Sequence, residues 1–185
     1  MECSTFEIAG LILIKPKVFS DNRGSFLETF HIDKYREIGI DKAFVQDNES
    51  VSSAMVLRGL HFQCPPFAQG KLIRVISGSI YDVAVDIRKN SPTYGRWHAE
   101  ILTGENRHQF WIPEGFAHGF LALEDQTIVN YKCTSVYQAG SEATLLWNDP
   151  DIGIHWPGTP VEISPKDLGG ESFSHFCSPF DSICL

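Results

Sequence analysis

The segment Leu72–Arg88, LIRVISGSIYDVAVDIR, decides the fold class of the chain. Two runs rich in β-branched residues flank Ser77-Gly78, a pair that favours a tight turn. In the second run alternate residues form an apolar face, made of Tyr81, Val83, Val85 and Ile87. The opposite face is small and polar, with Asp82, Ala84 and Asp86. The segment predicts a β-hairpin whose polar face points either into a ligand-holding barrel or out to solvent.

Other parts of the chain repeat this pattern, because glycine and proline separate short runs rich in β-branched or aromatic residues. Strand-like runs occur at 11–19, 26–30, 43–50, 56–63, 97–102, 108–113, 118–123 and 127–137. A short helix is predicted at 32–39, with Asp33 as N-cap and Gly39 beyond its end. A second helix is predicted to begin at SPKD, where Ser164 caps it and Asp167 completes a capping box. The pattern predicts an all-β barrel, jelly roll or sandwich with a few short helices.

Composition limits the classes of function. The chain has 185 residues and a net charge of −8, which argues against nucleic-acid or membrane-surface binding. The length fits one domain, residues 1–185, with a core at about 11–168 and a glycine- and serine-rich tail, 169–185, expected to be loosely ordered. The five cysteines form no C-x-x-C pair, and no signal peptide or membrane span is recognised. We therefore expect a cytoplasmic protein without disulfides.

The run Val56–Gln63, VLRGLHFQ, places Arg58 and His61 in an otherwise apolar strand. In a regular strand these two side chains point to opposite faces. They can share a pocket only if the pairing is interrupted, and Gly59 is where a β-bulge is tolerated. A partly exposed edge strand explains the same residues equally well.

The segment Trp111–Phe120, WIPEGFAHGF, contains the pattern P-x-G-x-x-H, which resembles the second signature of the cupin barrels. In metal-binding cupins the first signature carries H-x-H and a later glutamate. Here His61-Phe62-Gln63 stands where a second ligand histidine is expected. One or two histidines without a carboxylate fall short of a usual metal set, so a cupin-type jelly-roll barrel without a metal is predicted.

A longer series of motifs is more specific than this signature. In chain order they are DNRGSFLETF, FVQDNES, VLRGLHFQ, AQGKLIRV, YDVAVDIR, WIPEGFAHGF, YKCTSVY, LLWNDPDIGIHWP and SPKD. Together they closely resemble the dTDP-4-dehydrorhamnose 3,5-epimerase family, from about Leu11 to Asp167. The resemblance implies a dimeric, metal-free and cofactor-free cupin that epimerises dTDP-linked 4-keto-6-deoxy sugars in rhamnose biosynthesis. It also implies that the N-terminal strand, with Arg23 and Phe26, reaches into the partner subunit's site.

The resemblance further implies a role for each site residue. His61 becomes the general base, Asp167 the group that orients it, and Tyr131 the acid on the opposite face of the sugar. Lys71 would stabilise the oxyanion on O4. Residues implied to hold the nucleotide and sugar are Arg23, Phe26, Glu28, Gln46, Asp47, Asn48, Arg58, Gln63, Asp82, His118, Tyr137, Glu142 and Lys166, with Tyr137 stacking on thymine. Without the resemblance, Lys71 is typical of a solvated charge and Tyr131 of a core tyrosine.

The chemistry makes these residue types sensible. C3 and C5 flank the C4 ketone, so the ketone acidifies their protons, and removal of either one gives an enolate. A lysine in a dry pocket stabilises such an oxyanion, and histidine is a usable base near neutral pH. Inversion requires a proton from the other face, hence a second group such as Tyr131.

Three alternatives remain open. A C3-only epimerase would differ in sugar pose, which the sequence does not show. A metal-dependent cupin would bind iron, manganese or zinc. A non-catalytic sugar-nucleotide-binding module would have no need of an acid and a base on opposite faces.

Overall fold

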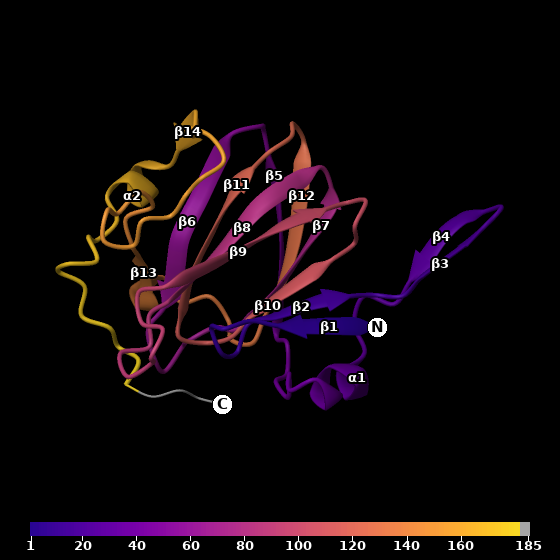
Figure 1. The fold of residues 1–185 in the computed structure, drawn as a ribbon, viewed down its shortest axis with the longest axis horizontal. Helices are drawn as coiled ribbons and strands as arrows, with labels where there is room; N and C mark the ends of the chain where they lie inside the picture. The colour runs from indigo at the N-terminus through magenta and orange to yellow at the C-terminus, as the bar shows by residue number, and fades with distance from the viewer. Residues whose placement is uncertain (182–185) are drawn as a thin grey trace.

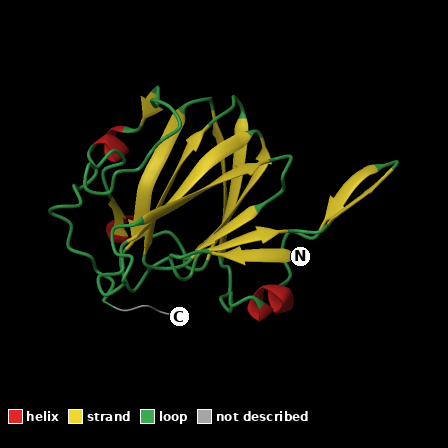
Figure 2. Cartoon of the chain, viewed as in Figure 1, coloured by secondary structure: helices red, strands yellow, loops and turns green. Residues whose placement is uncertain are grey.

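The computed structural model describes residues 1–181, and strands dominate the chain (Figure 2). One six-stranded sheet has the order β1 (Glu2–Thr5), β2 (Ile12–Lys15), β10 (Gln109–Ile112), β7 (Lys71–Ser77), β12 (Thr127–Cys133) and β5 (Gln46–Ser52). The second sheet has the order β13 (Glu142–Thr144), β6 (Val56–Gln63), β11 (Phe116–Ala122), β8 (Ser79–Asp86) and β9 (Trp97–Thr103), and β14 (Glu162–Ile163) pairs with β6. A separate hairpin joins β3 (Val18–Asp21) to β4 (Gly24–Leu27). The all-β prediction is confirmed.

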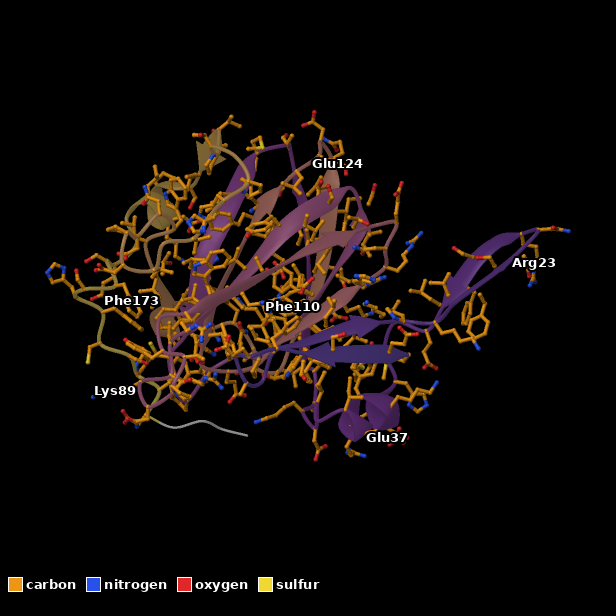
Figure 3. The ribbon with its side chains drawn as sticks, in the orientation of Figure 1. Arg23, Glu37, Lys89, Phe110, Glu124 and Phe173 are labelled. Carbon is orange, nitrogen blue, oxygen red and sulfur yellow. The ribbon has the colours of Figure 1, made fainter. Side chains whose placement is uncertain are left out.

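The two sheets form a barrel around an apolar interior (Figure 1). Phe110, Ile73 and Val129 from the first sheet meet Ile80 and Phe120 from the second, and all are buried. Phe110 lies in the middle of the barrel (Figure 3). Inward residues alternate with outward ones along each strand, so the same strands present polar side chains to the interior nearer the mouth.

The hairpin predicted at Leu72–Arg88 is wrong, although both strands exist. β7 pairs with β10 and β12, whereas β8 pairs with β11 and β9. Gly78, at φ +79°, connects the first sheet to the second. A Cβ at this position would lie 2.3 Å from Thr127 Oγ1, so a side chain does not fit there. The predicted polar face of β8 does point inward, where Asp82 and Ala84 are fully buried.

The strand expected at 11–19 breaks at Pro16, which lacks the N–H that a ladder requires. β2 stays in the first sheet, and β3 and β4 project from the barrel as a free hairpin (Figure 1). Arg23 lies toward its tip (Figure 3), and Phe19 and Phe26 are 52% and 68% exposed. Such apolar exposure on a projecting arm is typical of a surface that meets another molecule.

The helices are short: α1 (Ile32–Glu37), the 3₁₀ turn η1 (Ala139–Ser141) and α2 (Pro165–Leu168). The Asp33 cap is wrong, because His31 O accepts the first helical bond, from Tyr35 N at 3.0 Å, and Asp33 lies inside the first turn. Gly39 follows the end of α1 at φ +90°, as expected. In residues 1–181 no helix is long and apolar enough to cross a membrane.

The tail was expected to be loosely ordered, but its described part, 169–181, packs on the outer face of the second sheet. Phe176 and Phe180 stack edge-on against Phe62, with ring centroids 5.6 and 6.3 Å apart. Three phenylalanines spaced along the tail cover apolar surface, which explains the difference. Residues 182–185 lie outside the described part.

At Gly59 the backbones of β6 and β11 lie close together. The register shifts there, so that His61 pairs with His118 while Arg58 pairs with Phe120. A Cβ at Gly59 would lie 2.4 Å from the Cα of Gly119, and the residue has φ +132°. The bulge predicted at Gly59 is therefore present, and only glycine fits there.

We expect Gly59→Ala to lower the free energy of unfolding by at least about 2 kcal/mol, through steric overlap and backbone strain. Urea denaturation measures this. Gly140→Ala is the matched control, because nothing lies within 4 Å of a Cβ at that position. Equal midpoints for the two variants would contradict the close approach.

Candidate active site

A cavity of about 530 Å³ opens between the two sheets at the end where α2 and β14 lie. Its walls come from β5, β7 and β12 on one side and from β6 and β11 on the other. It is lined by Ser50, Val56, Leu57, Arg58, His61, Lys71, His118, Phe120, Tyr131, Tyr137, Glu142, Glu162, Ser164, Lys166 and Asp167. A second cavity of about 260 Å³ shares five of these residues: His61, Lys71, Tyr131, Tyr137 and Glu142. The two cavities therefore adjoin.

His61 and Asp167 form a hydrogen-bonded pair on the β6 wall. His61 Nε2 lies 2.6 Å from Asp167 Oδ1, and the second oxygen accepts a hydrogen bond from Gly59 N at 3.2 Å. Burial tends to raise the pKa of the Asp167 carboxyl, but these donors outweigh it and hold the pKa below its usual range. An ionised carboxylate can only accept, so Nε2 carries a proton, and in the neutral form of the ring Nδ1 is the nitrogen that keeps its lone pair.

Asp167 reaches His61 because α2 begins next to β6. Ser164 Oγ accepts a hydrogen bond from Asp167 N at 3.1 Å, and Pro165 occupies the first turn, as predicted. The reciprocal half of the predicted capping box is replaced, because the Asp167 carboxylate bonds to His61 and Gly59. The carboxylate is 3% exposed.

Tyr131 and Lys71 lie on the opposite wall. Tyr131 is on β12 and packs against the apolar interior, and burial raises the pKa of its phenol. Lys71 begins β7, directly across from Cys133 of β12. Burial lowers the pKa of the Lys71 ammonium, while Cys133 and the carboxylates of Asp82 and Glu142 oppose that shift. One wall thus offers a histidine base, and the other offers a phenol and a cation.

His118 and Asp82 form a second buried pair, beside the first. His118 Nε2 lies 2.7 Å from Asp82 Oδ1. Burial lowers the pKa of His118 even though Asp82 favours its charged form, so a neutral imidazole faces the cavity. Asp82 Oδ2 is buried and has no hydrogen-bond partner.

At the rim between the two cavities, Glu142 links Tyr137 to Lys166. Glu142 Oε2 accepts a hydrogen bond from the Tyr137 hydroxyl at 2.6 Å and forms an ion pair with Lys166 Nζ. Burial tends to raise the pKa of Glu142, but Lys166 and Tyr137 lower it overall. The Tyr137 ring is half exposed and faces both cavities.

Amide side chains hold the smaller cavity in shape. Gln46 Oε1 accepts from Tyr137 N at 2.8 Å, and Gln46 Nε2 donates to Asn48 Oδ1 at 3.0 Å. Gln63 Oε1 accepts from Gln138 N at 2.7 Å. Arg58 donates from Nε to Ser52 Oγ at 3.1 Å, which bridges β6 to the edge strand β5. Gln63, Gln46 and Asn48 therefore line the smaller cavity and Arg58 the larger one.

Five predicted residues do not line either cavity of this chain; one of them, Asp82, lies behind His118, to which it is hydrogen-bonded. Arg23 and Phe26 are on the projecting hairpin, where Arg23 pairs with Asp21. Glu28 pairs with Lys34 at 2.7 Å. Asp47 points to the outer face of β5 and pairs with Lys132 at 2.9 Å, because it alternates with the inward Gln46 and Asn48.

Several lining residues were not predicted from the sequence. Ser50 shares the inward face of β5 with Gln46 and Asn48, so strand alternation could have found it; its buried hydroxyl has no partner. Phe120 follows His118 by two residues on β11 and could have been found in the same way. Glu162 lies on β14, a two-residue strand with no sequence signal.

The donor set of the cavity is suited to proton transfer. Within residues 1–181, no three His, Cys, Asp or Glu side chains converge as metal ligands would. His61 and His118 each use Nε2 to contact a carboxylate. A base, a facing phenol and a half-buried cation can together remove a proton, stabilise an oxyanion and return a proton.

Known proteins match both the sequence and the fold. The family model described as dTDP-4-dehydrorhamnose 3,5-epimerase matches residues 5–175. The dTDP-4-dehydrorhamnose 3,5-epimerase of Methanothermobacter thermautotrophicus is 57% identical over 161 residues, 85% of this chain and 86% of that protein.

Two solved structures show the same fold. The dTDP-6-deoxy-D-glucose-3,5-epimerase of Legionella pneumophila, in complex with dTDP-4-keto-L-rhamnose, has a TM-score of 0.93 and 45% identity over 97% of each chain. A 3'-monoepimerase from Streptomyces bikiniensis, in complex with dTDP-quinovose, has a TM-score of 0.87 and 32% identity, over 91% of this chain and 86% of that one. The cupin-type jelly-roll prediction is confirmed by these matches, and the chain belongs to the dTDP-4-dehydrorhamnose 3,5-epimerase family.

Proposed function

We propose that this chain converts dTDP-4-dehydro-6-deoxy-D-glucose to dTDP-4-dehydro-L-rhamnose by inverting C3 and C5. As a member of the epimerase family the chain is an isomerase. The observation that carries the proposal is the placement of the His61–Asp167 pair and of Tyr131 on opposite walls of one cavity, with Lys71 beside Tyr131. A sugar ring between the walls meets a base on one face and an acid on the other.

The first half of each inversion is proton removal. Nδ1 of His61 takes the proton from the carbon next to the ketone, and the electron pair of the broken C–H bond forms an enolate with its charge on O4. Asp167 stabilises the imidazolium that results, because it already accepts from Nε2. The Lys71 ammonium is placed to stabilise the enolate oxygen, and its low-dielectric surroundings strengthen that interaction.

The second half is proton return. Tyr131 donates its hydroxyl proton to the carbon from the face opposite His61, which inverts the centre. Burial raises the pKa of this phenol, so it stays protonated throughout the neutral range. The same pair can act at C3 and at C5, because both carbons neighbour the one ketone.

Cationic and aromatic groups at the rim are proposed to bind the nucleotide. Lys166 and Arg58 can pair with the diphosphate inside an acidic protein. Tyr137 presents an exposed ring on which thymine can stack. Gln46, Asn48 and Gln63 line the smaller cavity, where their amides can meet the base or sugar.

We propose that the working enzyme is a homodimer of single-domain subunits in the cytoplasm. The β3–β4 hairpin leaves its own barrel and exposes Phe19 and Phe26, and β5 ends the first sheet with a free edge. An arm exchanged between subunits would cover both and bring Arg23 to the partner's cavity. The free thiols among residues 1–181 support a reducing compartment.

The proposed function predicts deuterium exchange at both C3 and C5 when the protein is mixed with dTDP-4-keto-6-deoxyglucose in heavy water. NMR of the sugar measures it, and a coupled ketoreductase should yield the rhamnose nucleotide. Exchange at C3 alone would select a C3-only epimerase. Absence of exchange with thymidine diphosphate still bound would select a binding module, and activity that depends on added iron, manganese or zinc would select a metal-dependent cupin.

His61→Ala and Tyr131→Phe should each lower kcat by roughly 10²–10⁴, as expected for loss of a general base or acid. Calorimetry should find nearly unchanged affinity for thymidine diphosphate in both. Tyr137→Ala is the contrasting variant, expected to weaken that affinity through loss of stacking. A wild-type kcat in either of the first two variants would remove that residue from its role.

Arm exchange can be tested by complementation. His61→Ala and Arg23→Ala should each be nearly inactive alone. After co-refolding, a mixed dimer has one cavity with His61 intact and Arg23 supplied by the partner, so about one quarter of wild-type activity should return. No recovery, with mixed dimers verified by mass spectrometry, would mean that each hairpin serves its own subunit.

A further inference from the structure

Glu142 is the carboxylate on which the rim of the cavity converges. It begins β13, which pairs with β6, and its neighbour across the ladder is Gln63. One oxygen, Oε2, is shared by the Tyr137 hydroxyl and the Lys166 ammonium. The Glu142 side chain is 15% exposed, whereas those of Lys166 and Tyr137 are about half exposed, so the two donors reach the carboxylate from the solvent side of the rim. Two donors on one mostly covered carboxylate oxygen restrict each other's position more than an isolated surface ion pair does.

The helix that carries Lys166 also carries Asp167, and the rest of it is weakly held. Backbone pairs anchor the segment at Ile163 on β6 and at Glu171 beside Leu145. Between these anchors, residues 164–169 are exposed except for Asp167. A helix of four residues has no stability of its own. Its orientation therefore depends on polar tethers at two consecutive positions: Lys166 to Glu142, and Asp167 to His61 and to Gly59 N.

We propose that Glu142 is a positioning residue: by holding Lys166 it fixes α2, and through Asp167 it fixes the ring and tautomer of His61. The inference rests on the proposed function for the meaning of the His61–Asp167 pair. It assigns Glu142 an action on the base through two other residues, in addition to the substrate contact expected of its position. Losing the tether would let α2 turn and lengthen the Asp167–His61 hydrogen bond.

Substrate binding strengthens this arrangement. A lysine ammonium has three N–H donors, so Lys166 can keep its bond to Glu142 and also donate to a phosphate oxygen. The diphosphate then becomes a third tether on α2. Occupancy of the nucleotide site is in this way coupled to the orientation of the base, and misplacement of a reacting group by about 1 Å can cost about a hundredfold in rate.

The competing explanation is a direct electrostatic effect of Glu142 on His61. A Glu142 carboxylate can stabilise a His61 imidazolium without help from Lys166. The two explanations differ for Glu142→Gln. An amide oxygen can still accept from Tyr137 and Lys166, so tethering predicts partial retention of kcat, whereas a direct charge effect predicts that Gln is as poor as Ala. They also differ when Lys166 is absent, because tethering needs Lys166 and the direct effect does not.

The first experiment is a double-mutant cycle on kcat at saturating substrate. Glu142→Ala and Lys166→Met are each expected to lose about tenfold or more, and the double variant no more than about twofold beyond the poorer single variant. Glu142→Gln should retain more activity than Glu142→Ala. Glu171→Gln is the matched control, because Glu171 follows α2 and its exposed side chain lies outside the cavities. Additive losses, or equal losses for Gln and Ala, would overturn the proposal.

The second measurement needs no substrate, so it separates failure of this inference from failure of the proposed function. Ring ¹⁵N signals of labelled histidine, assigned to His61 by their loss in His61→Ala, report the tautomer. The wild type and Glu171→Gln should show one protonated and one unprotonated ring nitrogen. Glu142→Ala and Lys166→Met should show averaged signals. Wild-type signals in both of these variants would overturn the proposal, even if their activity were low.

Discussion

The approach of Gly59 to Gly119 is the constraint on which the rest of the site depends. Neither residue can carry a Cβ: one at Gly59 would lie 2.4 Å from Gly119 Cα, and one at Gly119 would lie 2.8 Å from Arg58 O. The close approach creates the bulge, and the bulge lets Arg58 and His61 turn toward one cavity although they are three residues apart in a strand. It also leaves Gly59 N free to donate to Asp167. Backbone geometry at one residue therefore sets the position of the base and one hydrogen bond of its partner.

Burial of charge is the second feature that organises the site. Lys71, Asp82, His118 and Asp167 all lie in or beside a low-dielectric interior, where an unpaired charge is costly. Each of these side chains has a partner: the neutral His118 contacts Asp82, Asp167 contacts His61, and the Lys71 ammonium lies near carboxylates. Two buried polar atoms in this region, Asp82 Oδ2 and the Ser50 hydroxyl oxygen, have no hydrogen-bond partner. Unsatisfied buried polar atoms are rare in folded proteins, and these two lie in or beside the cavity that is proposed to hold a polar sugar.

Features that depend on neighbouring residues in the sequence were predicted, whereas strand pairing and long-range contacts mostly were not. The bulge at Gly59 and the Ser164 cap were predicted because each depends on neighbouring residues. The runs around Ser77-Gly78 were correctly predicted as strands, but their partners were not, because a β-branched run specifies an extended chain and not the strand that it pairs with. Asp47 was assigned to the site by motif resemblance, whereas strand alternation directs it outward. The contact between His61 and Asp167 spans 106 residues, and only resemblance to a known family suggested it.

The contact between His61 and Asp167 requires less ordering of the chain than its sequence separation suggests. β14, just before α2, pairs with β6, the strand that carries His61. Just after α2, Glu171 N donates to Thr144 O of β13, which is itself paired with β6 at His61. The segment that supplies Asp167 is therefore fastened to β6 before α2 and to β13 after it. Phe173 and Phe176 then pack its continuation against the outer face of the second sheet. The described part of the tail thus helps to hold the segment that brings Asp167 to His61, because each anchor shortens the chain over which α2 can move.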